Sequence, residues 1–244
     1  LCYVVQVYEY VKFTGDKSIL PEVGKTLDGI MNNFRKLADN RLIADFQYPF
    51  WNFYEWGNDS DNCGDLSRQK DALSPTRYSL ILNAYYVYAE ERFAALFPDK
   101  ATDVGGIKDL ISAEFYNPDK KMFRAYKGEE NYTEFANAMA ILIGVGDKTV
   151  AREIAEGKAK KATLAAAAYV YDALLSYGDE FKERVLSEID DNYKKMLDAG
   201  ATSFWETLEG VTENDRSCSL CHGWSALPIY YYAVTGKIKY EKED

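Results

Sequence analysis

Two short stretches near the end of the chain contain the residue types best suited to chemistry on a sugar. In the first, the carboxylate of Glu206 directly follows the indole of Trp205. In the second, His222, the only histidine of the 244 residues, lies two positions before Trp224. Aromatic rings stack on the apolar faces of sugars, and carboxylates perform the acid–base steps of glycosidic cleavage. Cleavage of this kind uses two carboxylates, so a second one has to be found.

The connection between Arg41 and Asp71 offers further candidates. It has no helical periodicity, is rich in aromatic residues that include Trp51 and Trp56, and continues into an acidic run. A long aromatic and acidic connection in a helical domain is more often functional than a plain spacer. Both tryptophans are therefore candidate platforms for a sugar, with burial in the core as the alternative.

Structural roles compete with these chemical ones. A carboxylate such as Glu206 also interacts favourably with the dipole at a helix N-terminus. A lone histidine carries no ligand pattern, so His222 has a purely structural alternative. The acidic residues Asp59, Asp61 and Asp65 lack the glycine and the terminal glutamate of an EF-hand loop, and their pattern is typical of a solvated turn.

The four cysteines, Cys2, Cys63, Cys218 and Cys221, are too few for a disulfide scaffold in a chain of this length. Reduced thiols favour a cytoplasmic protein. The run from Cys218 to His222 satisfies the Cys-x-x-Cys-His pattern of covalent haem attachment, but that pattern is short and no secretory signal is visible. A zinc site would need the distant Cys2 or Cys63 to complete tetrahedral coordination. We therefore expect neither a cofactor nor a metal.

The composition excludes several classes of partner. The net charge is -10 and no basic block occurs, so nucleic acid and anionic membrane surfaces are poor partners. The most apolar run, Ala162 to Tyr171, ends at Asp172 and predicts a buried helix instead of a membrane span. The chain begins within what resembles an amphipathic helix, so we expect further sequence upstream of Leu1.

Hydrophobic periodicity predicts roughly nine or ten helices and little strand. At three of the junctions between these helices the sequence has a Gly-Asp pair, which begins at Gly15, Gly146 or Gly178. In each pair Gly can adopt the left-handed conformation that ends a helix, and Asp can cap the next one, which makes neighbouring helices antiparallel. The chain is thus predicted to be an all-α toroid of helical hairpins. The predicted helices cover 1–14, 19–38, 74–97 (capped by Ser74), 104–114, 131–145 (capped by Asn131), a short stretch after 147, 160–177, 179–197 and 222–234, with a small β-hairpin at 115–126.

The segment Gly200-Ala-Thr-Ser-Phe-Trp-Glu206, followed by Ser219-Leu-Cys-His-Gly-Trp-Ser225, resembles the end of the catalytic domain of bacterial α-L-rhamnosidases, glycoside hydrolase family 78. The resemblance covers nearly the whole chain, and Trp-Glu followed by Ser-Leu-x-His is its most specific part. It implies an (α/α)6 barrel, a six-hairpin glycosidase fold, in agreement with the predicted hairpins. Three further stretches fit in the family's order: Tyr8 to Asp16, Phe53 to Trp56, and Thr133 to Ile141.

The resemblance also implies roles for individual residues. Glu206 matches the family's general base, the carboxylate that activates water in an inverting hydrolysis. His222 matches a histidine that binds the sugar in the −1 subsite, and Trp56 matches a tryptophan that lines the subsite. Glu55 stands where many members have Asp. The expected site therefore comprises Glu206 as the catalytic residue and five substrate-binding residues: His222, Trp56, Glu55, Trp205 and Trp51.

The family's general acid is a Glu in a motif of the Cys-Pro-x-Arg-x-Glu type that precedes the first matched stretch, and this chain has no such motif. We expect residues 1–244 to be a single catalytic-type α/α-barrel domain that lacks its first hairpin or hairpins and belongs to a longer chain. The predicted function is hydrolysis of terminal α-L-rhamnosides in glycosides or polysaccharides. The alternative is a relative or fragment that binds carbohydrate without cleaving it. The expected partner is a carbohydrate, and homo-oligomerisation stays open.

Overall fold

The computed structural model describes residues 1–39, 41–47, 50, 52–54, 76–210 and 219–238. These residues form mainly α-helices, together with a short antiparallel hairpin of strands β1 (Tyr116–Asn117) and β2 (Met122–Phe123). The predicted all-α fold is thus confirmed, and so is the small β-hairpin. In this part of the chain, no helix combines the length and the apolar composition that a membrane crossing requires.

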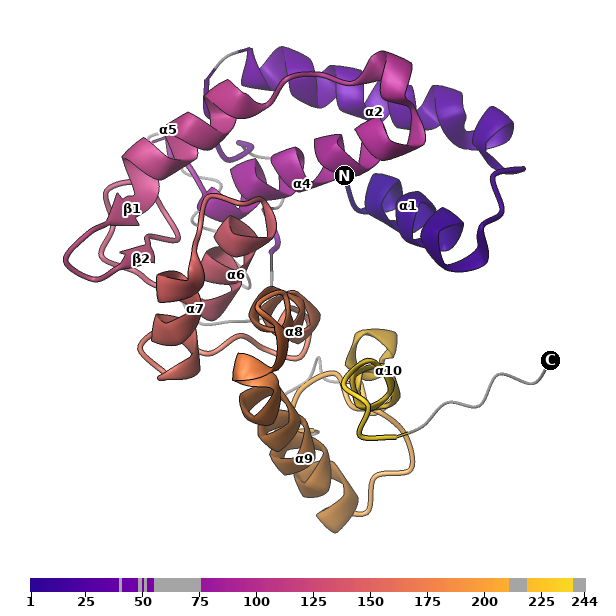
Figure 1. Ribbon diagram of the computed structural model, residues 1–244, viewed down its shortest axis with the longest axis vertical. Coiled ribbons are helices and arrows are strands. Elements are labelled where there is room, and N and C mark those ends of the chain that lie inside the picture. The colour runs from indigo at the N-terminus through magenta and orange to yellow at the C-terminus, as the bar shows by residue number, and fades with distance from the viewer. Residues whose placement is uncertain (40, 48–49, 51, 55–75, 211–218, 239–244) are drawn as a thin grey trace.

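The helices form an inner and an outer row that follow one arc (Figure 1). Along the inner row, α1 packs on α4, α4 on α6, and α6 on α8. The inner helices are α1 (Cys2–Thr14), α4 (Leu80–Leu96), α6 (Glu134–Leu142), α8 (Ala167–Leu175) and α10 (Pro228–Val234). The outer helices are α2 (Leu20–Ala38), α5 (Gly105–Phe115), α7 (Lys148–Ala155) and α9 (Lys182–Asp198).

Burial explains why the rows are arranged in this way. Helices α4 and α6 bury side chains on nearly every side, as expected for a helix that is apolar all round. Helices α2, α7 and α9 each carry one buried stripe and a polar outer face. One continuous hydrophobic core therefore lies between and within the rows, from Val4 in α1 to Tyr231 in α10.

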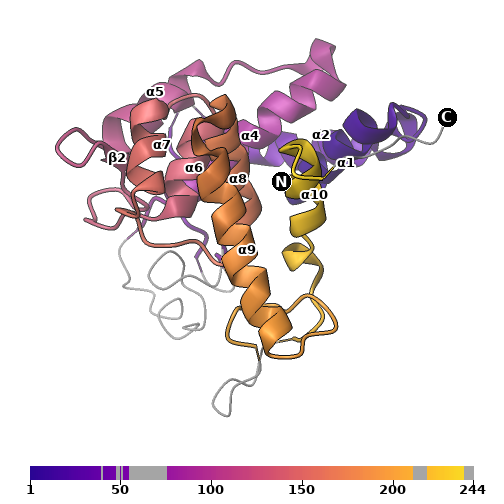
Figure 2. The ribbon, with the colours of Figure 1, turned by 60° about the horizontal axis from the view of Figure 1, so that its bottom comes forward.

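The connections differ strongly between the two ends of the helices. Inner helices are followed by the short connections 15–19, 97–104, 143–147 and 176–181, and outer helices by the long ones 39–79, 116–133, 156–166 and 199–227. Because consecutive helices run in opposite directions, all the long connections lie at the same end of the helices, that is, on one face of the arc. Figure 2 shows the last of them below α9 and α10. The stretch around Glu206 and the aromatic connection before α4 therefore belong to the same end.

The two central inner helices begin with the same kind of cap. The Ser79 hydroxyl accepts a hydrogen bond from the backbone N–H of Leu82 at the start of α4 (3.3 Å). The Thr133 hydroxyl accepts one from the backbone N–H of Ala136 at the start of α6 (3.1 Å). Each cap satisfies one of the N–H groups that the first turn of a helix leaves unpaired.

Four residues after each cap, a fully buried asparagine fixes the preceding long connection to the helix. The side chain of Asn83 accepts from the backbone N–H of Ile43 (2.7 Å) and donates to the carbonyl groups of Ile43 (2.9 Å) and Ser79 (2.8 Å). The side chain of Asn137 makes the same three bonds to Phe123 (2.8 and 3.0 Å) and Thr133 (2.9 Å). An amide offers one acceptor and two donor hydrogens, so each asparagine is well satisfied in a place that water cannot reach.

The predicted start of α4 is wrong because the backbone of its first residues is already used by another connection. Ser74 lies outside the described residues, residues 76–78 are not helical, and the helix begins at Leu80. The backbone of Ser79 forms a bridge with Tyr126, and the N–H of Leu80 donates to the carbonyl of Ala125 (2.9 Å). These bonds hold the segment extended until the cap.

The same physical reason corrects three further helix starts. Helix α6 begins after Thr133 and not at Asn131, whose carbonyl accepts from the N–H of Ala125 (2.7 Å). Helix α8 begins at Ala167, since the backbone around Lys160 pairs with that of Thr133. Residues 222–227 form only a short 3₁₀ turn, and α10 begins at Pro228, so this proline occupies a first turn where its missing N–H is harmless.

Two of the three predicted left-handed glycines are confirmed, and the third is wrong. Gly15 (φ 71°) and Gly178 (φ 75°) have the left-handed conformation. At the third junction Gly144 (φ 77°) adopts it instead of Gly146. Gly146 is needed for a different reason, because a Cβ there would lie 2.9 Å from the backbone nitrogen of Ile141.

The predicted aspartate caps hold at only one junction. Asp147 caps α7 by accepting from the N–H groups of Thr149 (2.8 Å) and Val150 (3.2 Å). Asp16 instead accepts from the N–H of Ser18 in the turn before α2, and Asp179 lies within the 3₁₀ helix Gly178–Phe181.

We predict that Asn137→Ala lowers the free energy of unfolding by about 2–4 kcal/mol, because it leaves the buried N–H and C=O of Phe123 without a partner. Urea denaturation followed by circular dichroism measures this loss. The control is Asn33→Ala on the exposed face of α2, which should change stability by less than about 0.5 kcal/mol. Equal midpoints for the two variants would contradict the role of Asn137.

Candidate active site

Two segments of the last long connection pair with each other and bring the predicted catalytic residues together. The N–H of Glu206 donates to the carbonyl of Ser219 (2.8 Å), and the N–H of His222 donates to the carbonyl of Phe204 (2.8 Å). The hydroxyl of Ser203 also donates to the carbonyl of Leu220. We refer to residues 203–206 and 219–222 as the paired loop. These bonds hold the segment that contains Glu206 against the segment that contains His222.

The carboxylate of Glu206 is held by one oxygen only. Its Oε2 accepts from the backbone N–H of Ser219 (2.8 Å), while its Oε1 has no hydrogen-bond partner among the described residues. The residue is largely buried, with 8% of its surface exposed. A carboxylate with one fixed oxygen and one available oxygen suits the task of accepting a proton from a bound water.

His222, on the other segment of the paired loop, has a defined orientation. Its ring stacks on the indole of Trp224 with 3.6 Å between ring centroids and 28° between planes. The backbone nitrogen of Trp224 lies 3.5 Å from Nδ1, and Nε2 has no partner within the described part of the chain. The indole N–H of Trp224 donates to the carbonyl of Glu206 (3.1 Å). Trp224 thus links the histidine ring to the backbone of Glu206.

The paired loop is anchored to α9 and to the chain that enters α10. The hydroxyl of Tyr193, in α9, donates to the carbonyl of Ser225 (2.5 Å), and the ring of Tyr193 packs edge-on against Phe204. The hydroxyl of Ser225 donates to the carbonyl of Trp205 (2.5 Å). Ser225 is fully buried, so these bonds are sheltered from water. A rigid anchor of this kind is what the positioning of a catalytic group requires.

Trp205 itself is half-buried and packs against the hydrophobic core. A Cβ added to Gly210 would lie 2.8 Å from two carbons of its ring, and Gly210 has a left-handed φ of 61°. The close approach explains why a glycine is found there. The predicted contact of Trp205 with substrate stays a prediction.

Three predicted site residues, Trp51, Glu55 and Trp56, lie outside the described residues. The chain around them is tied back on itself: Asn52 accepts from the N–H of Phe46 (2.8 Å) and donates to its carbonyl (2.6 Å). The acidic residues Asp59, Asp61 and Asp65 and the cysteines Cys63 and Cys218 also lie outside the described part.

Asp45 is a residue that the sequence reasoning missed. It is 6% exposed, its Oδ1 accepts from the hydroxyl of Tyr54 (2.9 Å), and its buried Oδ2 has no hydrogen-bond partner among the residues that the structure describes. Burial raises the pKa of this carboxyl to about 6, against the pKa-lowering effects of Tyr54 and the nearby Arg77. The only available signal was an acidic residue placed between Leu42-Ile43-Ala44 and an aromatic run.

No cluster of three or more metal-ligating side chains occurs within residues 1–39, 76–210 and the other described segments. Cys221 is exposed with a free thiol. The residues around Glu206 offer a carboxylate, an imidazole and an indole, side-chain types that suit the binding of hydroxyl-bearing molecules.

Helical hairpins that present a carboxylate and aromatic side chains on their long connections define a glycosidase-type helical domain. The chain matches the family model of the bacterial alpha-L-rhamnosidase 6 hairpin glycosidase domain over residues 2–234. The chain therefore belongs to the bacterial α-L-rhamnosidase six-hairpin glycosidase family, and the resemblance found in the sequence is confirmed.

Two solved structures share this fold. A family 78 rhamnosidase of Bacillus sp. GL1 aligns with a TM-score of 0.75 and 19% identity, over 94% of this chain and 25% of that one. A rhamnosidase from Klebsiella oxytoca with rhamnose bound aligns with a TM-score of 0.74 and 18% identity, over 96% of this chain and 46% of that one. The chain thus spans less than half the length of either protein. No curated protein matches it.

We predict that Gly210→Ala destabilises the protein by about 2–4 kcal/mol, since it forces a side chain into a left-handed conformation and against the Trp205 ring. Thermal unfolding and near-ultraviolet circular dichroism, which reports on the tryptophan environment, measure the effect. Gly223→Ala is the matched control, because its Cβ meets no atom within 4 Å. A Gly210 variant as stable as the Gly223 variant would contradict the packing described for Trp205.

Asp45 makes stability depend on pH. The folded protein keeps the Asp45 proton up to about pH 6, whereas the unfolded chain loses it near the ordinary pKa of 3.8, so stability falls as pH rises through this window. Asp45→Asn removes that fall. Relative to wild type, we therefore expect the variant to gain on the order of 2–3 kcal/mol between pH 4 and pH 7. Denaturant titrations across this range test it. Asp99→Asn, at an exposed position, should show the same pH dependence of stability as wild type. The assignment would be contradicted if stability plotted against pH ran parallel for the Asp45 variant and wild type.

Proposed function

We propose that this domain hydrolyses terminal α-L-rhamnosides with inversion at the anomeric carbon, and that Glu206 is the general base. The observation that carries the proposal is the state of this carboxylate: one oxygen is fixed by the backbone N–H of Ser219, and the other has no partner among the described residues. Membership of the rhamnosidase family and the likeness to a rhamnosidase with rhamnose bound support the choice of sugar.

The proposed reaction is a single displacement. Glu206 Oε1 accepts a proton from a water molecule while the water oxygen attacks the anomeric carbon. The bond to the leaving oxygen breaks, and that oxygen takes a proton from a carboxylic acid on the opposite side of the sugar. We assign this second role to none of the described residues. In an inverting enzyme the two carboxyl groups lie about 6.5–9.5 Å apart, so direct contact of the acid with Glu206 is not expected.

His222 and the aromatic residues are proposed to bind the sugar. With Nδ1 turned toward the backbone of Trp224, the imidazole presents its Nε2 edge to a sugar hydroxyl. We further propose that Trp56, Glu55, Trp51 and Trp205 line the same subsite, because aromatic faces bind the apolar faces of pyranoses.

A second candidate function is carbohydrate binding without cleavage. It needs only groups that bind a sugar, such as the His222 ring and the Trp224 indole, and no second carboxylate. Calorimetric binding of rhamnose without any release of rhamnose from an aryl rhamnoside would favour this second candidate.

We predict that Glu206→Gln lowers kcat/KM for an aryl α-L-rhamnoside by about 10²–10⁴-fold, since the amide keeps the shape of the side chain but accepts no proton. Initial rates of phenol release measure it. Glu209→Gln, an exposed carboxylate of the same connection, should retain wild-type activity. Equal activity of the two variants would contradict the assignment of Glu206 as the general base.

A further inference from the structure

The β1–β2 hairpin and α7, which lie across the molecule from α10 in Figures 1 and 2, line a pocket. It has a volume of about 620 Å³, within the range of about 300–1,000 Å³ that is usual for ligand sites. One wall comes from the β1–β2 hairpin and the segment after it, and the other from the end of α7. Its lining residues are Asp119, Lys120, Met122, Glu130, Tyr132, Glu153 and Lys158.

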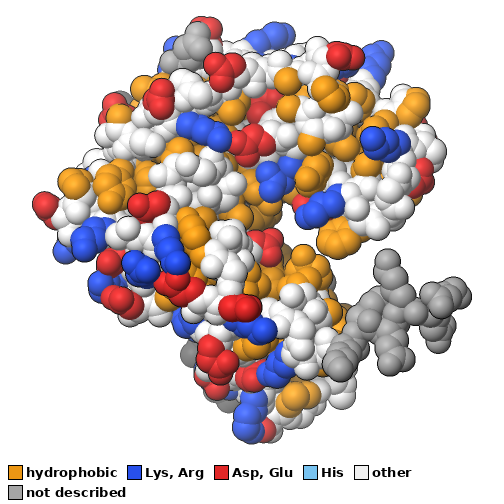
Figure 3. All heavy atoms as spheres, in the orientation of Figure 1, with side chains coloured by type: hydrophobic (Ala, Val, Ile, Leu, Met, Phe, Trp, Pro, Cys, Tyr) orange, Lys and Arg blue, Asp and Glu red, His pale blue; other side chains and the backbone are white. Residues whose placement is uncertain are grey.

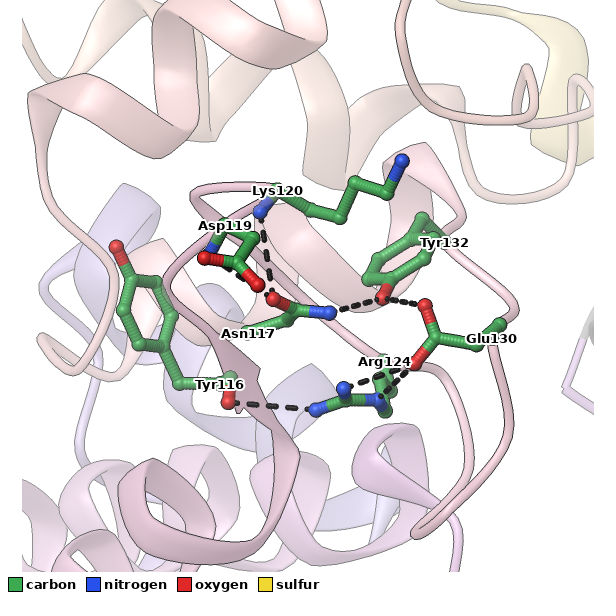
Figure 4. Close-up of polar contacts among 7 residues, drawn as sticks. All are labelled: Tyr116, Asn117, Asp119, Lys120, Arg124, Glu130 and Tyr132. Atoms are coloured by element: carbon green, nitrogen blue, oxygen red, sulfur yellow. Dashed lines mark hydrogen bonds and ion pairs between the residues drawn. The ribbon is translucent and has the colours of Figure 1, made fainter.

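The hairpin wall of this pocket is held by a chain of hydrogen bonds (Figure 4). The amide of Asn117 donates to the hydroxyl of Tyr132 (2.7 Å), which donates to Oε2 of Glu130 (2.5 Å). Arg124 donates to the other oxygen of Glu130 through two nitrogens (2.9 and 2.8 Å). The hydroxyl of Tyr132 is therefore fully engaged, and its ring is fixed as one face of the pocket.

The turn of the hairpin is fixed by the same asparagine. Its Oδ1 accepts from the backbone N–H groups of Asp119 (3.0 Å) and Lys120 (3.3 Å). The Lys120 side chain extends over the Tyr132 ring in Figure 4. Among the described residues, neither the Lys120 ammonium nor the Asp119 carboxylate has a hydrogen-bond partner. One unused donor group and one unused acceptor group thus border the pocket.

The opposite wall is also well ordered. The ammonium of Lys158 pairs with Glu153 (2.6 Å) and Glu156 (2.8 Å), and Glu153 is only 8% exposed. The bridge between Thr133 and Lys160 ties this wall to the start of α6. Both walls are therefore set before any ligand arrives, which lowers the cost of binding.

The chemistry of the lining favours a neutral, hydroxyl-rich ligand. Acidic and basic side chains intermix over the hairpin and α7 (Figure 3), and the pocket itself holds three carboxylates and two ammonium groups. No single charge dominates, so neither an anion nor a cation is preferred. Hydroxyl groups both donate and accept, and so match Lys120 and Asp119 together. The half-buried Tyr132 ring adds apolar surface for the C–H face of a sugar.

We propose that this pocket is an accessory carbohydrate-binding site for a neutral sugar unit, separate from the site at Glu206. It binds sugar without any chemical step, and it does not depend on cleavage at the paired loop.

The test follows backbone amide signals by nuclear magnetic resonance while the Glu206→Gln protein is titrated with a neutral trisaccharide of α-linked L-rhamnose. We expect saturable shifts at residues 119–132 and 153–158, with a dissociation constant different from that of shifts at 219–225. Adding Asp119→Ala and Lys120→Ala should weaken binding at 119–158 by at least about fivefold and leave binding at 219–225 unchanged. The matched control, Glu22→Ala with Lys36→Ala on α2, should change neither.

Three outcomes would overturn the proposal: no shifts at 119–132, shifts that the Asp119 and Lys120 changes leave untouched, or a loss at both sites together. A stronger response to a galacturonate trisaccharide would refute the neutral class of ligand. With Glu206 intact, unchanged rhamnoside hydrolysis by the Asp119 and Lys120 variant is expected. A protein that binds the trisaccharide at 119–158 but hydrolyses no rhamnoside would refute the proposed function and leave this inference standing.

Discussion

The hydrogen bonds of two buried asparagines hold the long connections before α4 and α6 in place, and the rest of the structure at this end of the helices depends on them. Asn83 and Asn137 each stand four residues after a helix cap and bind both the N–H and the C=O of a residue in the preceding connection. Helix packing alone would leave these long connections free to move. Because the amides are inaccessible to water, breaking their bonds would leave buried polar groups unpaired. The two connections are therefore fixed at Ile43 and at Phe123.

The connection that carries Glu206 reaches the same result by other means. Its backbone pairs with itself from 203–206 to 219–222, and Tyr193 and Ser225 fasten the pair to α9. The functional side chains thus belong to connections, while their rigidity comes from the helices. This division lets one helical arc carry both a candidate catalytic site at Glu206 and a separate sugar pocket beside Tyr132.

The sequence predicts the helices well because their apolar stripes are local, and it predicts their starts badly. Helices α4 and α6 start at Leu80 and Glu134 because another connection already binds the preceding backbone, and α10 starts at Pro228 after the 3₁₀ turn Gly223–Ser225. No local pattern contains that information. The family resemblance assigned site roles to Glu206 and His222, and the structure holds their two segments together through backbone hydrogen bonds, while the roles themselves stay predictions. Asp45 was missed because its burial is a tertiary property, and Gly146 was misjudged because steric contact and a left-handed turn both require glycine.

The central claim is that Glu206 activates a water molecule and does not attack the sugar itself. The most direct measurement is the proton nuclear magnetic resonance spectrum of rhamnose recorded in the first moments of hydrolysis of an aryl α-L-rhamnoside, before the anomers interconvert. A single displacement by water predicts that the β-anomer appears first and the α-anomer grows later by mutarotation. Initial release of the α-anomer would require a covalent intermediate, and so would contradict the role assigned to Glu206.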